Sequence, residues 1–203
     1  IFPWVKGEYA IGVVPQTSNQ LQEGVRPDWL FVAQDTEPET GHSALQHLDT
    51  LARQQGLGVG PLSVEDQQIL TWTKLAASPD NTRPQASLKL LQAQVVGAHT
   101  QVNSYRIFAS SVAAVGEALK APQNSLSVTS NFQKAIAPLP LPNNGYVYLD
   151  WPKTRPLLEQ QFPILRVIEG AAQPFFNHLH SLAFSSYNTK TNVQRSKLFI
   201  RLT

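Results

Sequence analysis

The chain has 203 residues, of which 42% are hydrophobic and 15% charged, with a formal net charge of +2 and neither cysteine nor methionine. A positive charge this weak does not predict nucleic-acid binding, and the absence of cysteine excludes disulfides, thiol catalysis and cysteine-type zinc sites. No apolar run approaches the roughly 20 residues that a helix needs to span a bilayer.

The first third of the chain has the pattern of two strands followed by one helix. Runs rich in β-branched and aromatic residues predict strands at 8–14 and 28–34. Apolar residues at helical spacing then predict a helix over 43–55, which Gly56 ends.

The middle of the chain consists of extended runs and one short helix. The extended runs cover 62–77, 88–98 and 100–110. Ser110 and Ser111 end the last of these runs, and serine is a favoured N-cap residue. We therefore expect a helix over 112–120, which Pro122 stops.

In the last third, a strand ends abruptly at a capping residue. The apolar run 146–149 alternates with period two, Asp150 follows it at an N-cap position, and Pro152 lies in the first helical turn. Further helical segments are expected at 132–137 and from about Ile164 onward.

The C-terminus predicts a β-hairpin with strands at 181–187 and 193–202. Alternation in the second strand places Leu198, Ile200 and Leu202 toward the core. The opposite side of this strand is then expected to face solvent.

Basic side chains gather on that opposite side, where Phe199 interrupts them. With the lysine of the turn they form a basic stripe, whose members are Lys190, Arg195, Lys197 and Arg201. Such a stripe is common on an edge hairpin, where it discourages edge-to-edge pairing. It is also a candidate contact for anionic headgroups or an acidic partner.

Three stretches repeat the order strand, capping residue, helix, namely LFVAQDTEPETGHSALQHL, RIFASSVAAVGEAL and YVYLDWPKTRPLLEQ. The residues between them are strand-like, which favours a mixed, mainly antiparallel sheet over a doubly wound parallel one. We therefore predict a single α+β domain over residues 1–203, with helices packed on one face of the sheet. Because the chain starts at Ile1 and lacks methionine, we expect it to be part of a longer protein.

No residue cluster has the spacing of a known catalytic or metal site. Asp35, Glu37 and Glu39 do not match a calcium-binding loop and precede a helix, where negative charge is favourable. Ser110 and Ser111 lack the glycines of a hydrolase nucleophile elbow. The chain has five histidines, His42, His47, His99, His178 and His180, and their spacing favours structural roles over zinc binding.

Three stretches, FPWVKGEYAIGVVP, NNGYVYLDW and SLAFSSYNTKTNVQRSKLFIRL, resemble a cyanobacterial domain-of-unknown-function family, the one numbered three-three-five-two. The resemblance spans most of the chain and transfers no catalytic residues. It implies an N-terminal hydrophobic anchor outside this chain and an extracytoplasmic body, in the periplasm or the thylakoid lumen.

The expected function is a non-enzymatic binding or scaffolding module at a membrane surface, without metal or cofactor. Its expected partner is a membrane protein complex or the membrane surface itself. Two alternatives stay open, a carrier of an apolar small molecule and, more remotely, a hydrolase. A cavity above about 300 Å³ would favour the carrier, and a Ser–His or paired-carboxylate contact in a cleft would favour the hydrolase.

Overall fold

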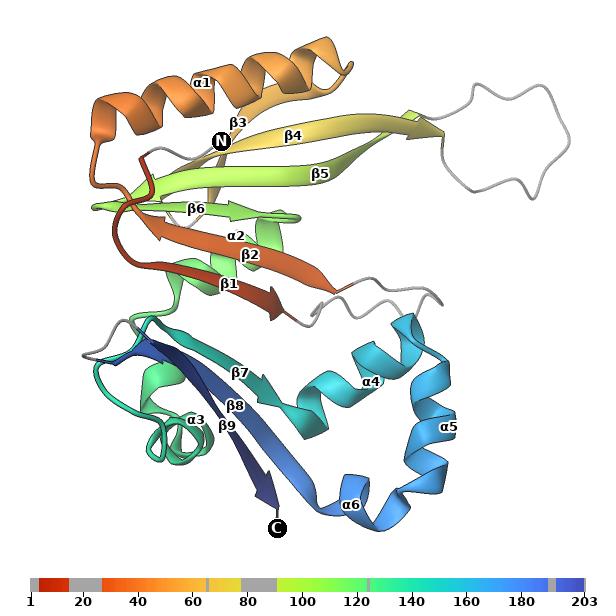
Figure 1. Cartoon of the computed structure of the whole chain (residues 1–203). Coiled ribbons are helices and arrows are strands. Elements are labelled where there is room, and N and C mark those ends of the chain that lie inside the picture. The colour runs from red at the N-terminus through yellow and green to blue at the C-terminus, as the bar shows by residue number, and fades with distance from the viewer. Residues whose placement is uncertain are drawn as a thin grey trace, which may run out of the picture. The chain divides into compact units, whose positions relative to one another are not determined.

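The computed structural model describes residues 4–14, 27–64, 66–77, 91–123, 125–189 and 193–202. The chain divides into two compact units, Ile1–Lys120 and Ala121–Thr203, each with its own sheet (Figure 1). The expected single domain over residues 1–203 stays a prediction. Among the described residues, no helix is both long and apolar enough to cross a membrane.

Unit 1 contains a six-stranded sheet in which every neighbouring pair is antiparallel, in the order β1-β2-β6-β5-β4-β3. Its strands are β1 Tyr9–Val14, β2 Asp28–Gln34, β3 Gly58–Val64, β4 Gln67–Ala77, β5 Leu91–Val102 and β6 Tyr105–Ala109. Its helices are α1 Pro38–Gln54 and α2 Val112–Leu119.

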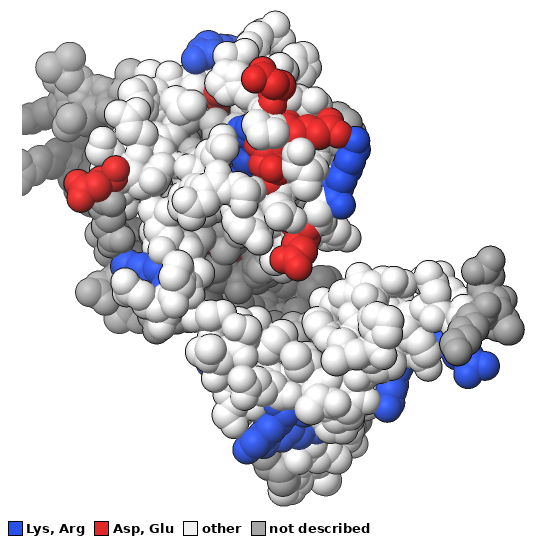
Figure 2. Space-filling view, turned by 90° about the vertical axis from the view of Figure 1, so that its left-hand side faces the viewer, with Lys and Arg blue, Asp and Glu red and all other residues white. Residues whose placement is uncertain are grey.

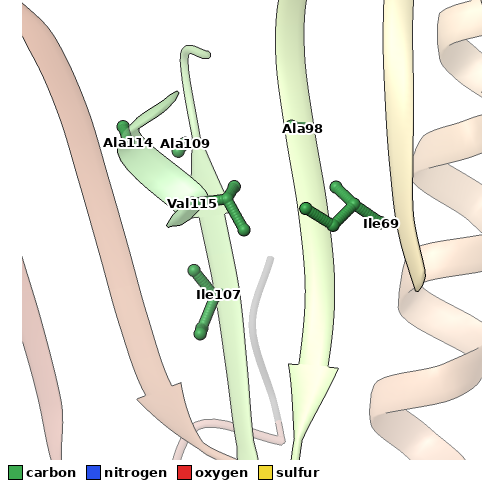
Figure 3. Close-up of a cluster of buried hydrophobic side chains, with 6 residues drawn as sticks. All are labelled: Ile69, Ala98, Ile107, Ala109, Ala114 and Val115. Carbon is green, nitrogen blue, oxygen red and sulfur yellow. The ribbon is translucent and has the colours of Figure 1, made fainter. Parts of the chain in front are cut away.

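The two helices of unit 1 pack on opposite faces of this sheet, because alternate residues of β6 contribute to different cores. Ile107 joins the cluster beneath α2, whose buried members are Ile69, Ala98, Ile107, Ala109, Ala114 and Val115 (Figure 3). Phe108 joins Trp4, Ala33 and Leu45 of α1 in a second cluster. The expected placement of the helices on one face therefore differs from the structure in this unit, since β6 is buried on both of its faces.

Unit 2 contains a three-stranded antiparallel sheet in the order β7-β8-β9. Its strands are β7 Tyr146–Asp150, β8 Leu179–Asn188 and β9 Gln194–Leu202, and the last two form the predicted C-terminal hairpin. Its helices are the short 3₁₀ helix η1 Leu126–Val128 and the α-helices α3 Ser130–Ile136, α4 Trp151–Gln161, α5 Ile164–Ala171 and α6 Gln173–His178. The α+β class predicted from the sequence is confirmed.

The repeated order of strand, cap and helix is present three times, as β2–α1, β6–α2 and β7–α4. The Ser111 side chain accepts a hydrogen bond from Ala114 N at 3.1 Å, and Asp150 accepts one from Lys153 N at 3.4 Å, so both are N-caps as predicted. Helix α1 begins at Pro38, earlier than expected, because proline is well suited to the first helical position.

Two turns lie elsewhere than the sequence pattern indicated. The polar centre of the expected strand 62–77 is a hairpin turn between β3 and β4, with Asp66 at φ 63°. Strand β5 runs through His99 to Val102, and the chain turns at Asn103, which has φ 53°. Asp and Asn tolerate this left-handed conformation better than most residues. This tolerance explains why these two residue types stand at the two turns.

Candidate interaction surface

The β7-β8-β9 sheet carries two full rows of apolar side chains on one side, here called the outer face. In the first row Val147 pairs with Phe184, which pairs with Leu198. In the second row Leu149 pairs with Leu182, which pairs with Ile200. Alternation adds Leu202, so the outer face comprises Val147, Leu149, Leu182, Phe184, Leu198, Ile200 and Leu202.

Most of these side chains are exposed, whereas Leu149 and Leu182 are half-buried. The exposed fractions are 64% for Val147, 59% for Leu198 and 51% for Leu202. Full burial of such a side chain contributes about 1.5–3 kcal/mol of free energy. A partner that covers an apolar surface extending over three strands would gain this free energy from several side chains at once.

Helix α3 covers the opposite side of this sheet, here called the inner face. Its Ala135 packs with Leu139 and with Ala183 of β8, and Tyr148 and Phe199 pack at the edge of this cluster. Where β8 pairs with β7, its inner face carries small side chains, Ser181, Ala183 and Ser185, all of them buried. Small side chains allow the helix to approach the sheet closely.

The predicted orientation of the last strand is therefore wrong. Leu198, Ile200 and Leu202 were expected toward the core, but they lie on the exposed outer face, and Phe199 points to the packed inner face. Alternation separates the two sides of β9 correctly. It does not decide which side α3 covers, and this depends on the small residues of β8.

The basic stripe lies on the inner-face side of β9, and its members have different surroundings. Arg195 is exposed, and the exposed Lys197 donates a hydrogen bond to the carbonyl oxygen of Pro138 at 2.7 Å. Arg201 is half-buried, and its Nη1 has no hydrogen-bond partner among the described residues, from which Lys190 is absent. The part of Figure 2 that corresponds to unit 2 shows Lys and Arg side chains and no Asp or Glu. Contact of this stripe with an anionic surface stays a prediction.

One end of the inner face brings ionisable groups together. Burial raises the pKa of the Tyr148 hydroxyl, and the nearby Asp150 carboxylate raises it further, whereas Arg201 acts in the opposite direction. Tyr148 is therefore protonated at neutral pH and available as a hydrogen-bond donor.

Unit 1 holds two buried polar contacts to the sheet, one from the loop before α1 and one from α1 itself. Arg106 Nε of β6 donates to Asp35 Oδ2 at 2.6 Å, and both side chains are almost fully buried. Gly41 of α1 makes room for this pair, because a Cβ there would lie 2.7 Å from Arg106 Nε. The ring of Trp4 lies against the guanidinium, 5.7 Å from centroid to carbon.

The second contact was missed by the sequence analysis. Asp49 Oδ1 of α1 lies 3.0 Å from His99 Nε2 and accepts a hydrogen bond from Trp72 Nε1 at 2.7 Å. A signal was present, because Asp49 falls on the same helical stripe as Leu45 and Ala52 and so had to be buried with a partner.

The three acidic residues considered as a calcium site lie before or in the first turn of α1. Of the acidic cluster, Asp35 binds Arg106, Glu37 binds Lys6, and Glu39 lies in the first turn of α1. The hydrogen bond from Lys6 holds the pKa of Glu37 below its usual value.

Ser110 and Ser111 both donate hydrogen bonds to the Asp28 carboxylate, at 2.6 and 2.8 Å. These bonds tie the start of α2 to the start of β2. A serine bound to a carboxylate is not paired with the imidazole base that would activate it as a nucleophile. The two serines therefore stabilise the junction between β6 and α2.

Two cavities of about 270 Å³ each lie within the units. The first lies between α1 and the sheet of unit 1, and its walls include His42, His99 and Arg106. The second lies against α4, α5 and α6 of unit 2, and its walls include Arg155, Glu159, Arg166 and Glu169. Both therefore have charged or ionisable linings.

Comparison with known proteins gave one match. The sequence model of a family described as Protein of unknown function (DUF3352) matches residues 1–202. Neither the comparison with curated proteins nor the comparison with solved structures gave a match.

Proposed function

We propose that this chain, which belongs to the DUF3352 family, is a non-enzymatic binding module whose contact surface is the outer face of the β7-β8-β9 sheet. The observation that carries the proposal is the exposure of Val147, Phe184 and Leu198, which form one apolar row across all three strands. The occupant proposed is an apolar surface of a partner protein in a membrane complex.

The distribution of charge favours a protein over a lipid surface as the occupant of the outer face. Binding to an anionic bilayer draws on Lys and Arg beside the apolar surface. The rows of the outer face contain no charged residue, whereas Lys197 and Arg201 lie on the opposite side of the sheet. A flat, uncharged apolar patch has the composition of the centre of a protein–protein interface.

The basic stripe supports a second, weaker contact as part of the same proposal. Arg195 and Lys197 are exposed, so they are free to face anionic headgroups or an acidic partner while the outer face is occupied. The proposed location is extracytoplasmic, in the periplasm or thylakoid lumen, with a membrane anchor outside this chain.

Neither alternative function gains support from the described residues. The two cavities have about 270 Å³ each, which is below the size expected of a carrier, and the second also has a charged lining that does not suit an apolar cargo. The serines considered for a hydrolase are bound to the Asp28 carboxylate. The two carboxylates that share the second cavity, Glu159 and Glu169, are both paired with Arg155.

Co-purification from native membranes tests the proposal. Tagged full-length protein should retain a defined membrane partner, and Val147→Asp and Leu198→Asp should each abolish its recovery. Lys134→Asp is the control, since it places a carboxylate on an exposed position of α3, outside both the outer face and the basic stripe. Recovery of the tagged protein alone, or equal recovery of the partner by all variants, would contradict the proposal.

A further inference from the structure

The helices α4 and α5 of unit 2 are joined by a chain of alternating charges. Arg155 Nη2 lies 2.6 Å from Glu169 Oε2, and Arg155 Nε donates to Glu159 Oε1 at 2.7 Å. At the other end, Arg166 Nε lies 3.4 Å from Glu159 Oε2. Two carboxylates and two guanidiniums therefore alternate along one wall of the second cavity, and their charges cancel.

Helix α5 has the reverse of the usual polarity of a surface helix. Its inward side carries Glu169, which is 5% exposed, while Ile164 and Val167 are exposed to 63% and 67%. A surface helix usually buries its apolar side and exposes its charges. The inward position of Glu169 therefore calls for a cause other than core packing.

One oxygen of this buried carboxylate has no partner among the described residues. Glu169 Oε2 is bound by Arg155, whereas Oε1 is buried and accepts no hydrogen bond. An unpaired oxygen on a buried carboxylate costs considerable free energy unless a donor reaches it. Glu169 lines the cavity, so a bound molecule is placed to supply that donor.

The opposite end of the charge chain offers donors. The Arg166 side chain is 68% exposed, and its contact with Glu159 is longer than the contacts of Arg155. A guanidinium has five N–H groups, so this contact leaves donors for a further anion. Gln173 and Asn177 add amide groups to the lining, and Phe176 adds an apolar surface.

We propose that this cavity binds a small zwitterion of the amino-acid type, with its ammonium group donating to the Glu169 carboxylate and its carboxylate accepting from Arg166. A lining of zero net charge matches a ligand of zero net charge, whereas a single ion would leave one charge unmatched. Phe176 would contact the ligand's carbon skeleton. The proposal is independent of the outer face, so either can fail without the other.

Isothermal titration calorimetry of the chain with four probes tests this proposal. L-alanine carries both charges, acetate and ethylammonium carry one each, and glycerol carries none. We expect saturable binding of L-alanine and binding of each other probe that is weaker by about tenfold or more. Acetate, ethylammonium or glycerol binding as tightly as L-alanine would overturn the proposal, as would no saturable binding of L-alanine up to about 10 mM.

Two variants assign the ends of the ligand. Arg166→Gln and Glu169→Gln should each weaken L-alanine binding by about tenfold or more, and Lys153→Gln, an exposed cation on the same helix pair, should not. Glu169→Gln also removes the ionic partner of Arg155, so circular dichroism must show that this variant is folded. If Glu169→Gln is not folded, the test rests on Arg166→Gln, because Arg166 is exposed. Unchanged binding of L-alanine by Arg166→Gln would overturn the proposal.

Discussion

Leu198 of β9 lies directly opposite Phe184 of β8 on the outer face, and both side chains are exposed, to 59% and 39%. Cross-strand apolar neighbours of this kind stabilise a sheet by about 0.2–1 kcal/mol, far less than they gain by full burial. The pair thus marks the surface where we expect a partner protein to bind.

The first prediction concerns which side of β9 contributes to folding. Phe199→Ala should lower the free energy of unfolding by about 1–3 kcal/mol, because Phe199 packs on the α3 cluster. Leu198→Ala should change it by less than about 0.5 kcal/mol, because Leu198 is mostly exposed. Urea denaturation followed by circular dichroism measures both values. A larger loss for Leu198→Ala would show that the outer face is the packed one.

The second prediction concerns the cap of α4. Asp150→Ala should lower the free energy of unfolding by about 0.5–2 kcal/mol and leave the fold intact, because the Lys153 amide loses its acceptor. Asp150→Asn keeps a capping oxygen and is the control, which should recover most of that loss. Equal losses for Ala and Asn would assign the effect to charge and not to capping.

The third prediction concerns the buried ion pair of unit 1. Asp35→Ala leaves the Arg106 guanidinium buried without its carboxylate, and we expect a loss of about 3–5 kcal/mol in the free energy of unfolding. Glu39→Ala, an exposed acidic residue of the first turn of α1, should cost at most about 1 kcal/mol. Thermal and chemical denaturation of the two variants provide the comparison. A loss for Asp35→Ala no larger than that for Glu39→Ala would be incompatible with the pairing.

The fourth prediction concerns pH. The hydrogen bond from Arg155 holds the pKa of Glu159 below its usual value of 4.5. A lowered folded-state pKa stabilises the fold above pH 4.5, and this contribution disappears as the pH falls through the folded-state pKa. An NMR titration of the Glu159 carboxyl carbon should therefore show a midpoint below 4.5, which Arg155→Gln moves back up. A midpoint that Arg155→Gln leaves unchanged would rule out this cause.

Features that depend on neighbouring residues were predictable from the sequence. Ser111 and Asp150 are N-caps because a short oxygen-bearing side chain directly precedes a helical pattern, and this information is local. The strands β2 and β9 have strong alternating or β-branched patterns, and their positions were predicted within about two residues.

Features that depend on distant residues were not predictable. The pairs Asp49–His99 and Asp35–Arg106 join residues 50 and 71 positions apart, and no local pattern specifies which charges meet. The exposed side of β9 is decided by the small Ala183 of the neighbouring strand and by the packing of α3. The alternation within β9 alone therefore led to the wrong prediction that Leu198, Ile200 and Leu202 face the core.

Cysteine labelling at the outer face in native membranes tests the central claim most directly, because the chain contains no other cysteine. Leu198→Cys and, as control, Lys134→Cys on the exposed side of α3 are each reacted with a maleimide, once in native membranes and once as purified protein. If a partner protein covers the outer face, labelling of Leu198→Cys should be about tenfold or more slower in membranes than in the purified protein, while that of Lys134→Cys changes less. Equal rates for Leu198→Cys in both preparations would contradict the claim that the outer face is a contact surface.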